Sequence, residues 1–375
     1  MKSVLGLIIC FSEKSNLRDL TSHRTIASVM YGGRYRLVDF MLSSMVNSGI
    51  ADVGLVMRSK YQSLIGHMGS GKDWDLSRKK GGLVLLPPYA YSERSSPLTS
   101  GENRSKVDAL IGAMDLLEDS KCEYVILADS NIVGNLPLDK ALDSHIASGK
   151  KMTAICAPAD AISPLGVYSK IGSDGAMEAT LLGDDGNGEY AYKNLDIYIL
   201  QRKYLIDMLE RCATRNIRSL DREVFADIVD EGQMNTYVVD GYTVKITDMD
   251  SYYKASMDLL KKDVRAQLFQ RNRPILTHVH DENPCYYSEY AQVSESLIAD
   301  GTSISGTVEN SIIFRDVVIE RDAVVKNSII MAGTVIQEGA SIENMIVDKN
   351  VTVRKNKRMM GQQTYPIVIA KDTVV

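Results

Sequence analysis

The stretch from Ile312 to Ile342 reads IIFRDVVIERDAVVKNSIIMAGTVIQEGASI and decides the fold of the C-terminal part of the chain. Branched apolar residues recur in and around it at every sixth position: Ile312, Val318, Val324, Ile330, Ile336 and Ile342. Polar or small turn residues such as Lys326-Asn327 and Glu338-Gly339 separate them. A period of six belongs neither to a helix nor to an alternating strand, but is typical of a β-helix whose coils have three short faces. We therefore predict a solenoid in which the sixth-position side chains point into a stacked core.

The chain before this stretch alternates short β-branched runs with longer helical patterns. This alternation is typical of an α/β domain with a mostly parallel sheet covered by helices. Strands are expected at residues 4–9, 52–57, 124–127, 152–157, 195–200 and 233–239. Helices are expected at residues 37–47, 106–117, 138–148, 203–211, 221–229 and 249–259. We predict an α/β domain over 1–260, a linker over 261–295 and the β-helix over 296–375.

Composition narrows the classes of protein to consider. The chain has 375 residues, of which 45% are apolar and 24% charged, as in a folded protein of two domains. Its net charge of -5 argues against a nucleic-acid partner. No apolar run is long enough for a membrane span. The five cysteines are scattered singly, which predicts reduced thiols and a cytoplasmic protein.

Several stretches together resemble the bacterial glucose-1-phosphate adenylyltransferase (ADP-glucose pyrophosphorylase) family. They are YGGRYRLVDF at 31–40, NSGI at 47–50, SYYKASMDLL at 251–260, IADG at 298–301 and GTVENS at 306–311. The resemblance covers nearly the whole chain. It implies a dinucleotide-binding-like nucleotidyltransferase domain followed by a left-handed β-helix. Within the family, the chain is most similar to the non-catalytic members.

The phosphate-binding positions implied by this resemblance are degraded. Catalytic members carry a loop of the form GGxGxR after the first strand, and the matching positions here are Phe11, Ser12, Lys14 and Asn16, so the glycines and the arginine are missing. The next motif, RAKPAV, contributes a lysine, and Ile26 takes that place here. Stabilisation of developing charge is usually the largest catalytic term, so we expect little or no catalysis.

The resemblance also implies two aspartates that hold Mg²⁺ between the reacting phosphates. The first, in the motif GDH, is matched by Asp129, whereas Lys245 stands at the position of the second, in the motif WxDVGT. We infer that the Lys245 ammonium takes the place of the metal and pairs with Asp129, so that no metal site and no cofactor are expected. Asp248, three residues further on, is an alternative ligand, and Mg²⁺ is expected only if activity remains.

The sugar-binding positions are degraded as well. The EKP motif, whose lysine contacts the sugar phosphate, has no match in 178–184, and the SMGIY motif reads Asn194-Leu195-Asp196-Ile197-Tyr198. The GTADA motif, matched by 105–109, retains only its last two residues, Asp108 and Ala109. The alternative is that Asp108 is present because it caps or packs a helix and not because it binds substrate.

Two arginines are candidates for effector binding. Arg34 matches a lysine that contacts an anionic sugar-phosphate effector in bacterial relatives, and Arg36 follows two residues later. Guanidinium groups suit phosphate geometry. The alternative is that both are solvated surface cations near a turn.

We therefore expect a regulatory, catalytically inactive subunit of ADP-glucose pyrophosphorylase in glycogen biosynthesis. It would assemble with a catalytic subunit, as a hetero-tetramer, through the β-helix face at 296–353 and the rim of the first domain, and would respond to a sugar-phosphate or nucleotide effector. A homo-oligomer is also possible. One alternative is a weak adenylyltransferase that has rebuilt its phosphate site from Lys14, Arg18 and Asp248. Another is a stand-alone sugar-phosphate sensor.

Overall fold

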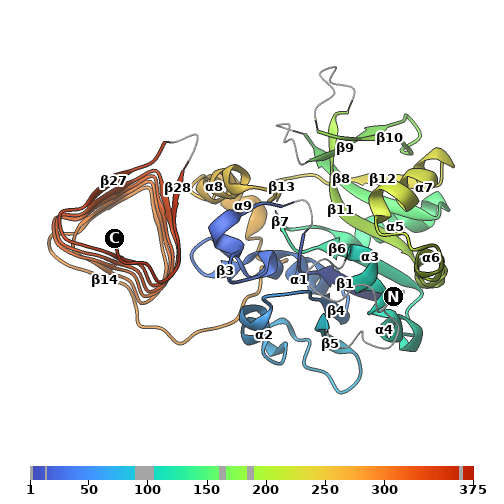
Figure 1. Ribbon diagram of the computed structural model, residues 1–375, viewed down its shortest axis with the longest axis horizontal. Coiled ribbons are helices and arrows are strands. Elements are labelled where there is room, and N and C mark those ends of the chain that lie inside the picture. Colours follow the sequence, from blue (N-terminus) through green and yellow to red (C-terminus); the bar gives the residue numbers. More distant parts are fainter. Residues whose placement is uncertain (1–2, 13–14, 89–104, 160–165, 184–189, 363–365) are drawn as a thin grey trace.

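The computed structural model describes residues 3–12, 15–88, 105–159, 166–183, 190–362 and 366–375. It has an N-terminal α/β domain and a C-terminal β-helix of triangular cross-section that lies beside it (Figure 1). Both domains match the predicted fold class.

The main sheet of the α/β domain has nine strands. They run in the order β10-β9-β11-β6-β1-β4-β5, and β8 pairs with β11 and β12. The strands β6, β1, β4 and β5 are parallel neighbours, whereas β11 is antiparallel to both β6 and β8. Their bounds are β1 Val4–Ile9, β4 Asp52–Val56, β5 Gly82–Leu86, β6 Tyr124–Asp129, β8 Met152–Pro158, β9 Val167–Ile171, β10 Met177–Leu182, β11 Tyr192–Gln201 and β12 Met234–Val238. Two small sheets pair β2 (Met30–Tyr31) with β3 (Tyr35–Arg36) and β7 (Ile132–Gly134) with β13 (Thr243–Lys245).

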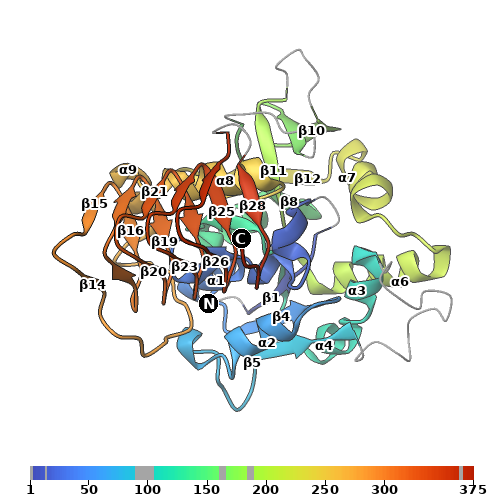
Figure 2. The same cartoon turned by 60° about the vertical axis from the view of Figure 1, so that its left-hand side comes forward.

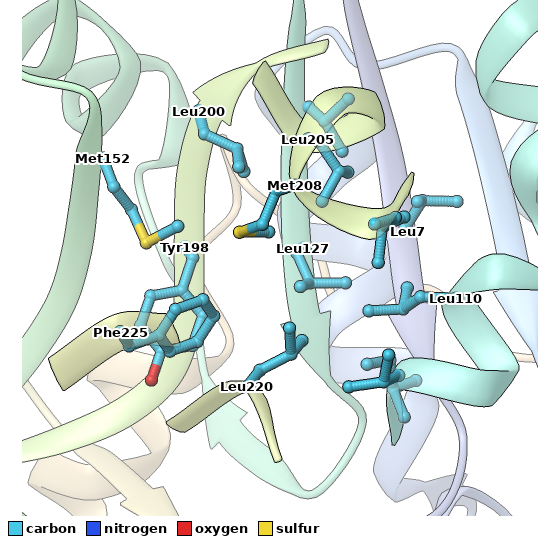
Figure 3. Close-up of a cluster of buried hydrophobic side chains, with 14 of the residues drawn as sticks. Leu7, Leu110, Leu127, Met152, Tyr198, Leu200, Leu205, Met208, Leu220 and Phe225 are labelled. Carbon is cyan, nitrogen blue, oxygen red and sulfur yellow. The ribbon is translucent and has the colours of Figure 1, made fainter. Parts of the chain in front are cut away.

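Helices cover both faces of the main sheet. Its central strands, β1 and β6, are therefore buried on both sides. The helices are α1 Leu37–Asn47, α2 Gln62–Met68, α3 Lys106–Ile111, α4 Met114–Asp119, α5 Leu138–Ser148, α6 Arg202–Arg215, α7 Ala226–Asp230, α8 Met249–Asp258 and α9 Lys262–Leu268. Figure 3 shows the apolar cluster on one face, where Leu7 and Leu127 of the sheet meet Leu110 of α3 and Met208 of α6. The single helix predicted over 106–117 is interrupted between α3 and α4, and a π-helical turn at Asp221–Phe225 precedes α7.

The β-helix consists of three parallel five-stranded sheets, one for each face of the solenoid. The first face contains β14 Tyr286–Tyr287, β17 Ser303–Ile304, β20 Val318–Ile319, β23 Val335–Ile336 and β26 Thr352–Val353. The second contains β15 Gln292–Ser294, β18 Thr307–Glu309, β21 Val324–Lys326, β24 Ser341–Glu343 and β27 Arg358–Met360. The third contains β16 Leu297–Ile298, β19 Ile312–Ile313, β22 Ile329–Ile330, β25 Met345–Val347 and β28 Ile367–Ile369.

The sixfold spacing identified the solenoid but was wrong about three of the inward residues. Val318 is 37% exposed and Val324 half-buried, and the residues that follow them, Ile319 and Val325, point inward instead. The cause is the register: Val318 pairs with Val335, so a coil here has 17 residues and one of its faces is a residue short of six. Ile312 is buried, but against the α/β domain and not in the solenoid core.

The third face of the solenoid packs on the α/β domain. One apolar cluster combines Ile312, Phe314 and Ile329 of the solenoid with Tyr31 and Tyr252 of the α/β domain. The buried ion pair between the Arg24 Nη2 and Asp348 Oδ2 atoms, 2.6 Å long, joins the domains at the same contact. A large shared apolar surface favours a fixed arrangement of the two domains.

The solenoid begins before residue 296, because β14 and β15 already form two faces of its first coil. The segment expected as linker also contains α9. The described part of the chain has no helix that is both long and apolar enough to cross a membrane.

Candidate functional site

Asp129, the aspartate expected to remain from a metal site, is the last residue of β6 and is buried. Its Oδ1 atom lies 2.6 Å from the Nζ atom of Lys106, the first residue of α3. Its Oδ2 atom lies 3.9 Å from the Nζ atom of Lys245, at the end of β13. Lys245 in turn donates a hydrogen bond to the carboxylate of Asp196 in β11. The four side chains form an alternating chain of ammonium and carboxylate groups.

The structure thus places Lys245 near Asp129, as we inferred from the sequence, but gives its hydrogen bond to Asp196, which we had named only within the degraded SMGIY motif. Asp196 stands where the SMGIY motif has its glycine. Its backbone is left-handed, with φ of 53°, at a bulge in β11 between Asn194 and Ile197. Its amide donates to the Asn194 side chain at 2.8 Å, which holds this conformation. A carboxylate at a motif glycine, inside the predicted strand 195–200 whose other residues are aliphatic or tyrosine, was the signal available in the sequence.

The positive and negative charges of this cluster balance one another. Burial raises the pKa of Asp129, and the ammonium groups of Lys106 and Lys245 oppose this shift. Burial also lowers the pKa of Lys193, a half-buried residue of β11, and the nearby charge of Lys245 adds to this effect. Two ammonium groups already neutralise the two carboxylates, so the donor set does not suit Mg²⁺. Among the described residues, no three His, Cys, Asp or Glu side chains are arranged to hold a metal ion.

The expected phosphate-loop positions carry apolar and backbone contacts. Phe11 packs against the core, and the Arg58 guanidinium lies 5.3 Å from the centre of its ring. Ser12 is half-buried, and the Asn16 amide donates to the Thr247 carbonyl at 2.7 Å. Lys14 lies outside the described residues.

Ile26, at the position of a second family cation, is 4% exposed and belongs to the apolar cluster between the domains. An ammonium group placed there would face a hydrocarbon environment. The position therefore serves the packing of the domains.

Of the alternative phosphate site, Asp248 has a structural role. Asp248 caps α8: its carboxylate accepts from the Ser251 amide at 2.8 Å and from the Thr247 hydroxyl at 3.2 Å. Arg18 begins a short 3₁₀ helix with φ of 43°. Asp108 likewise caps α3 in a reciprocal pair with Ser105, as the helix-cap alternative expected.

The two candidate effector residues lie close to the solenoid. Gly33 is buried and faces Ala299 and Ile313 of the solenoid, where an added Cβ would be in contact with them, and Arg34 beside it is exposed. The Arg36 guanidinium is half-buried and donates from Nη1 to the Ser63 carbonyl at 2.6 Å and hydroxyl at 2.9 Å. Burial lowers the pKa of Arg36 to about 10, against the effect of Asp39, and Arg24 lowers it further. Arg34 is therefore a surface cation, whereas Arg36 is fixed in place.

Two cations of the solenoid, Arg315 and Lys349, lie near these arginines. Arg315 is 8% exposed, and its Nε atom has no hydrogen-bond partner in the described part of the protein. Burial lowers the pKa of Arg315, and the charge of Arg34 adds to this effect. Burial, with Arg36 and Arg24, lowers the pKa of Lys349 to about 8. We call Arg24, Arg34, Arg36, Arg315 and Lys349 the joint cations. Of these five side chains, only Arg24 forms an ion pair in the described part of the protein, with Asp348.

Comparison with known proteins agrees with this architecture. Residues 13–262 match the nucleotidyl transferase family, and residues 279–364 match the GlmU-like C-terminal hexapeptide family. The chain is 32% identical to the glycogen biosynthesis protein GlgD of Bacillus subtilis over 372 residues, which is 99% of this chain and 96% of that protein. It is 34% identical to GlgD of Geobacillus stearothermophilus over 327 residues, 85% of this chain and 82% of that protein.

A glucose-1-phosphate adenylyltransferase of Thermosipho africanus is 30% identical over 323 residues, 85% of this chain and 77% of that protein. Each of these matches covers at least 85% of this chain and so extends into both domains. This chain belongs to the nucleotidyl transferase family and is similar over most of its length to GlgD proteins and to glucose-1-phosphate adenylyltransferases.

Proposed function

We propose that this protein is a regulatory, catalytically silent subunit of ADP-glucose pyrophosphorylase in the cytoplasm, where it serves glycogen biosynthesis by binding and modulating a catalytic subunit. The glycogen role rests on its GlgD and adenylyltransferase relatives. The observation that carries the loss of catalysis is the network in which Lys106 and Lys245 neutralise Asp129 and Asp196.

The network gives a physical reason for the proposed lack of catalytic activity. Nucleotidyl transfer needs positive charge that becomes engaged as the pyrophosphate leaves. Here the ammonium groups of Lys106 and Lys245 are already bound to carboxylates, and Phe11 and Ile26 supply hydrocarbon at positions expected to meet phosphate. A triphosphate would have to separate these pairs inside a buried site, at a cost of several kcal/mol.

The joint cations support a second part of the proposal, that an anionic effector acts at the contact between the domains. Arg315 is buried, and among the described residues its Nε atom has no hydrogen-bond partner; a buried donor without an acceptor is costly. A phosphate group among Arg34, Arg36 and Arg315 would supply the missing acceptor. Because these residues come from both domains, the ligand would favour one domain arrangement and so change the state of a bound partner.

The test is pyrophosphate release from ATP and glucose 1-phosphate with Mg²⁺. It compares this protein alone, the glucose-1-phosphate adenylyltransferase of the same organism alone, and mixtures of the two. No release by this protein, together with a changed rate or effector response in the mixture, supports the proposal. Substantial turnover by this protein alone would overturn it.

A weak adenylyltransferase is the second candidate, and Lys193 is the observation that favours it. Lys193 is a half-buried cation that lies near Lys245 and Asp196 without belonging to a family motif. In that case Lys193→Gln should abolish the residual turnover, whereas Lys254→Gln, an exposed residue of α8, should leave it unchanged. Against it stands Asp248, whose carboxylate is committed to the cap of α8.

A further inference from the structure

A groove of about 830 Å³ lies between helix α8 and one corner of the solenoid. Its first wall is α8 with the residues that follow it, and its second wall is the turn that ends the second face in three successive coils. Figure 2 shows α8 and α9 along the same side of the solenoid as β15 and β21. The groove has the size of a ligand pocket. Its described lining residues belong neither to the cluster around Asp129 nor to the joint cations.

The two walls of the groove are fixed to each other. Tyr253 of α8 is 4% exposed, and its hydroxyl donates to the Asn327 carbonyl at 2.6 Å. The neighbouring Tyr252 lies in the apolar cluster between the domains. The groove is therefore preformed, and a ligand would bind with little cost of reorganisation.

The charges in the groove favour a neutral ligand. Three ion pairs run along it: Lys254 with Asp250 and Lys261 with Asp258, each 2.7 Å long, and Lys326 with Glu309, 2.8 Å long. Glu295 is exposed and has no ion pair in the described part of the protein. An anion would meet an excess of carboxylates over ammonium groups in the lining. A cation would gain only the attraction of one exposed carboxylate, which is small in water.

Hydrogen-bonding groups stand side by side on the solenoid wall. The Asn310 Nδ2 atom donates to the Asn327 Oδ1 atom at 2.7 Å. The Asn310 Oδ1 and Asn327 Nδ2 atoms, an acceptor and a donor, have no hydrogen-bond partner among the described residues. The Ser294 hydroxyl lines the same wall. Neighbouring donors and acceptors match two adjacent hydroxyl groups, each of which can both donate and accept.

The α8 wall adds apolar surface. Met257 and Leu260 are half-buried and line the groove beside Tyr253. A ligand that fits both walls is uncharged, carries several adjacent hydroxyl groups and has C–H surface to place on the apolar side chains. A chain of pyranose rings has all three properties, because its hydroxyls lie at the rim of each ring and its C–H groups on the faces.

We propose that this groove binds a neutral oligosaccharide, an α-1,4-linked glucan. The choice of glucose as the sugar rests on the proposed function in glycogen biosynthesis. The rim hydroxyls of one sugar face the amides of Asn310 and Asn327, and its C–H face lies on Met257 and Leu260. Such a site would hold the protein at the polymer whose synthesis it serves.

The first experiment titrates the full-length protein with maltoheptaose by isothermal calorimetry. Asn327→Gly should weaken binding by about fivefold, because it removes an amide that bonds the sugar. Glycine accepts the left-handed backbone of this position, where φ is 46°. Asn350→Gly is the matched control, since Asn350 is exposed, has φ of 56° and lies outside the groove. It should change the Kd by less than about twofold.

A second variant blocks the groove without removing a group that holds its walls together. Ser294 is exposed at the end of β15, and Ser294→Phe should fill the space beside Asn310 and weaken maltoheptaose binding by about tenfold or more. Circular dichroism should show an intact fold, because the position is exposed.

Three results would overturn the proposal. The first is a Kd of the unaltered protein for maltoheptaose weaker than about 10 mM. The second is maltoheptaose binding that neither Asn327→Gly nor Ser294→Phe weakens. The third is tighter binding of spermidine, an organic cation, that Ser294→Phe blocks.

Maltoheptaose binding is measured on this protein alone, whereas the proposed function is tested by the effect on the adenylyltransferase. If maltoheptaose binds in the groove and the adenylyltransferase is unaffected in the mixture, the proposed function fails and the sugar site stands. If the adenylyltransferase responds and maltoheptaose does not bind, the proposed function stands and the sugar site is wrong.

Discussion

Two cationic regions of this protein differ in how their charge is balanced. At the end of the main sheet, Lys106 and Lys245 are matched by Asp129 and Asp196. Among the joint cations, Arg24 is matched by Asp348, while Arg315 is buried without a carboxylate ion pair among the described residues. A matched buried cation is a structural element that resists new ligands, whereas an unmatched one still gains free energy by binding an anion. We therefore expect the first region to exclude phosphate and the second to bind it.

The largest expected effect comes from breaking the matched region. Asp196→Ala leaves the Lys245 ammonium buried without its hydrogen-bond partner and should lower the free energy of unfolding by about 3–5 kcal/mol, measured by urea denaturation. The double variant Asp196→Asn with Lys245→Met removes both charges, keeps a residue that tolerates the left-handed backbone, and should recover most of this loss. An Asp196→Ala protein as stable as the unaltered one would show that the pair does not define this region.

Lys349, one of the joint cations, should make the free energy of unfolding depend on pH. Its pKa is lowered to about 8 in the folded protein from an ordinary value of 10.5. Between these values the unfolded state binds more protons, so Lys349 makes stability rise with pH from about 8 to 10.5, by on the order of 2 kcal/mol. Lys349→Met should remove this part of the pH dependence in urea titrations. Equal slopes for the two proteins would contradict the assignment.

A metal titration can show whether Lys245 alone keeps the matched region closed. Lys245→Asp should place a third carboxylate beside Asp129 and Asp196 and create a weak site for Mn²⁺. At about ten times the Kd, Mn²⁺ should then stabilise the variant by about 1.4 kcal/mol in thermal unfolding. The unaltered protein should show no such shift. A shift in both proteins would mean that the metal binds elsewhere.

The smallest effect is expected at Arg315. Arg315→Leu removes a buried guanidinium whose Nε atom has no hydrogen-bond partner among the described residues, so stability without added anion should change by no more than about 1 kcal/mol. Stabilisation by inorganic phosphate, measured as a rise in the thermal midpoint, should be lost in the variant. Arg211→Leu, an exposed position on α6, is the control and should retain it. Retained stabilisation in Arg315→Leu would place the anion site elsewhere.

The sequence by itself determined the two architectures, since each follows from a local repeat. Apolar periodicity located β1, α1 and α5 with their observed bounds. The step of six identified the solenoid, whereas the resemblance to the adenylyltransferase family placed Asp129 and Lys245 in one site. The solenoid and the three elements named above depend on side chains close in sequence, whose spacing fixes the backbone that can bury them.

Only the tertiary structure decided the partners of the charged groups. The pairing of Lys245 with Asp196 joins residues far apart in sequence and depends on a bulge in β11. The inward positions of Ile319 and Val325 depend on a coil of 17 residues, and the burial of Arg315 depends on the contact between the domains. Register and domain packing are set by the sum of many weak apolar contacts, which no single stretch of sequence contains.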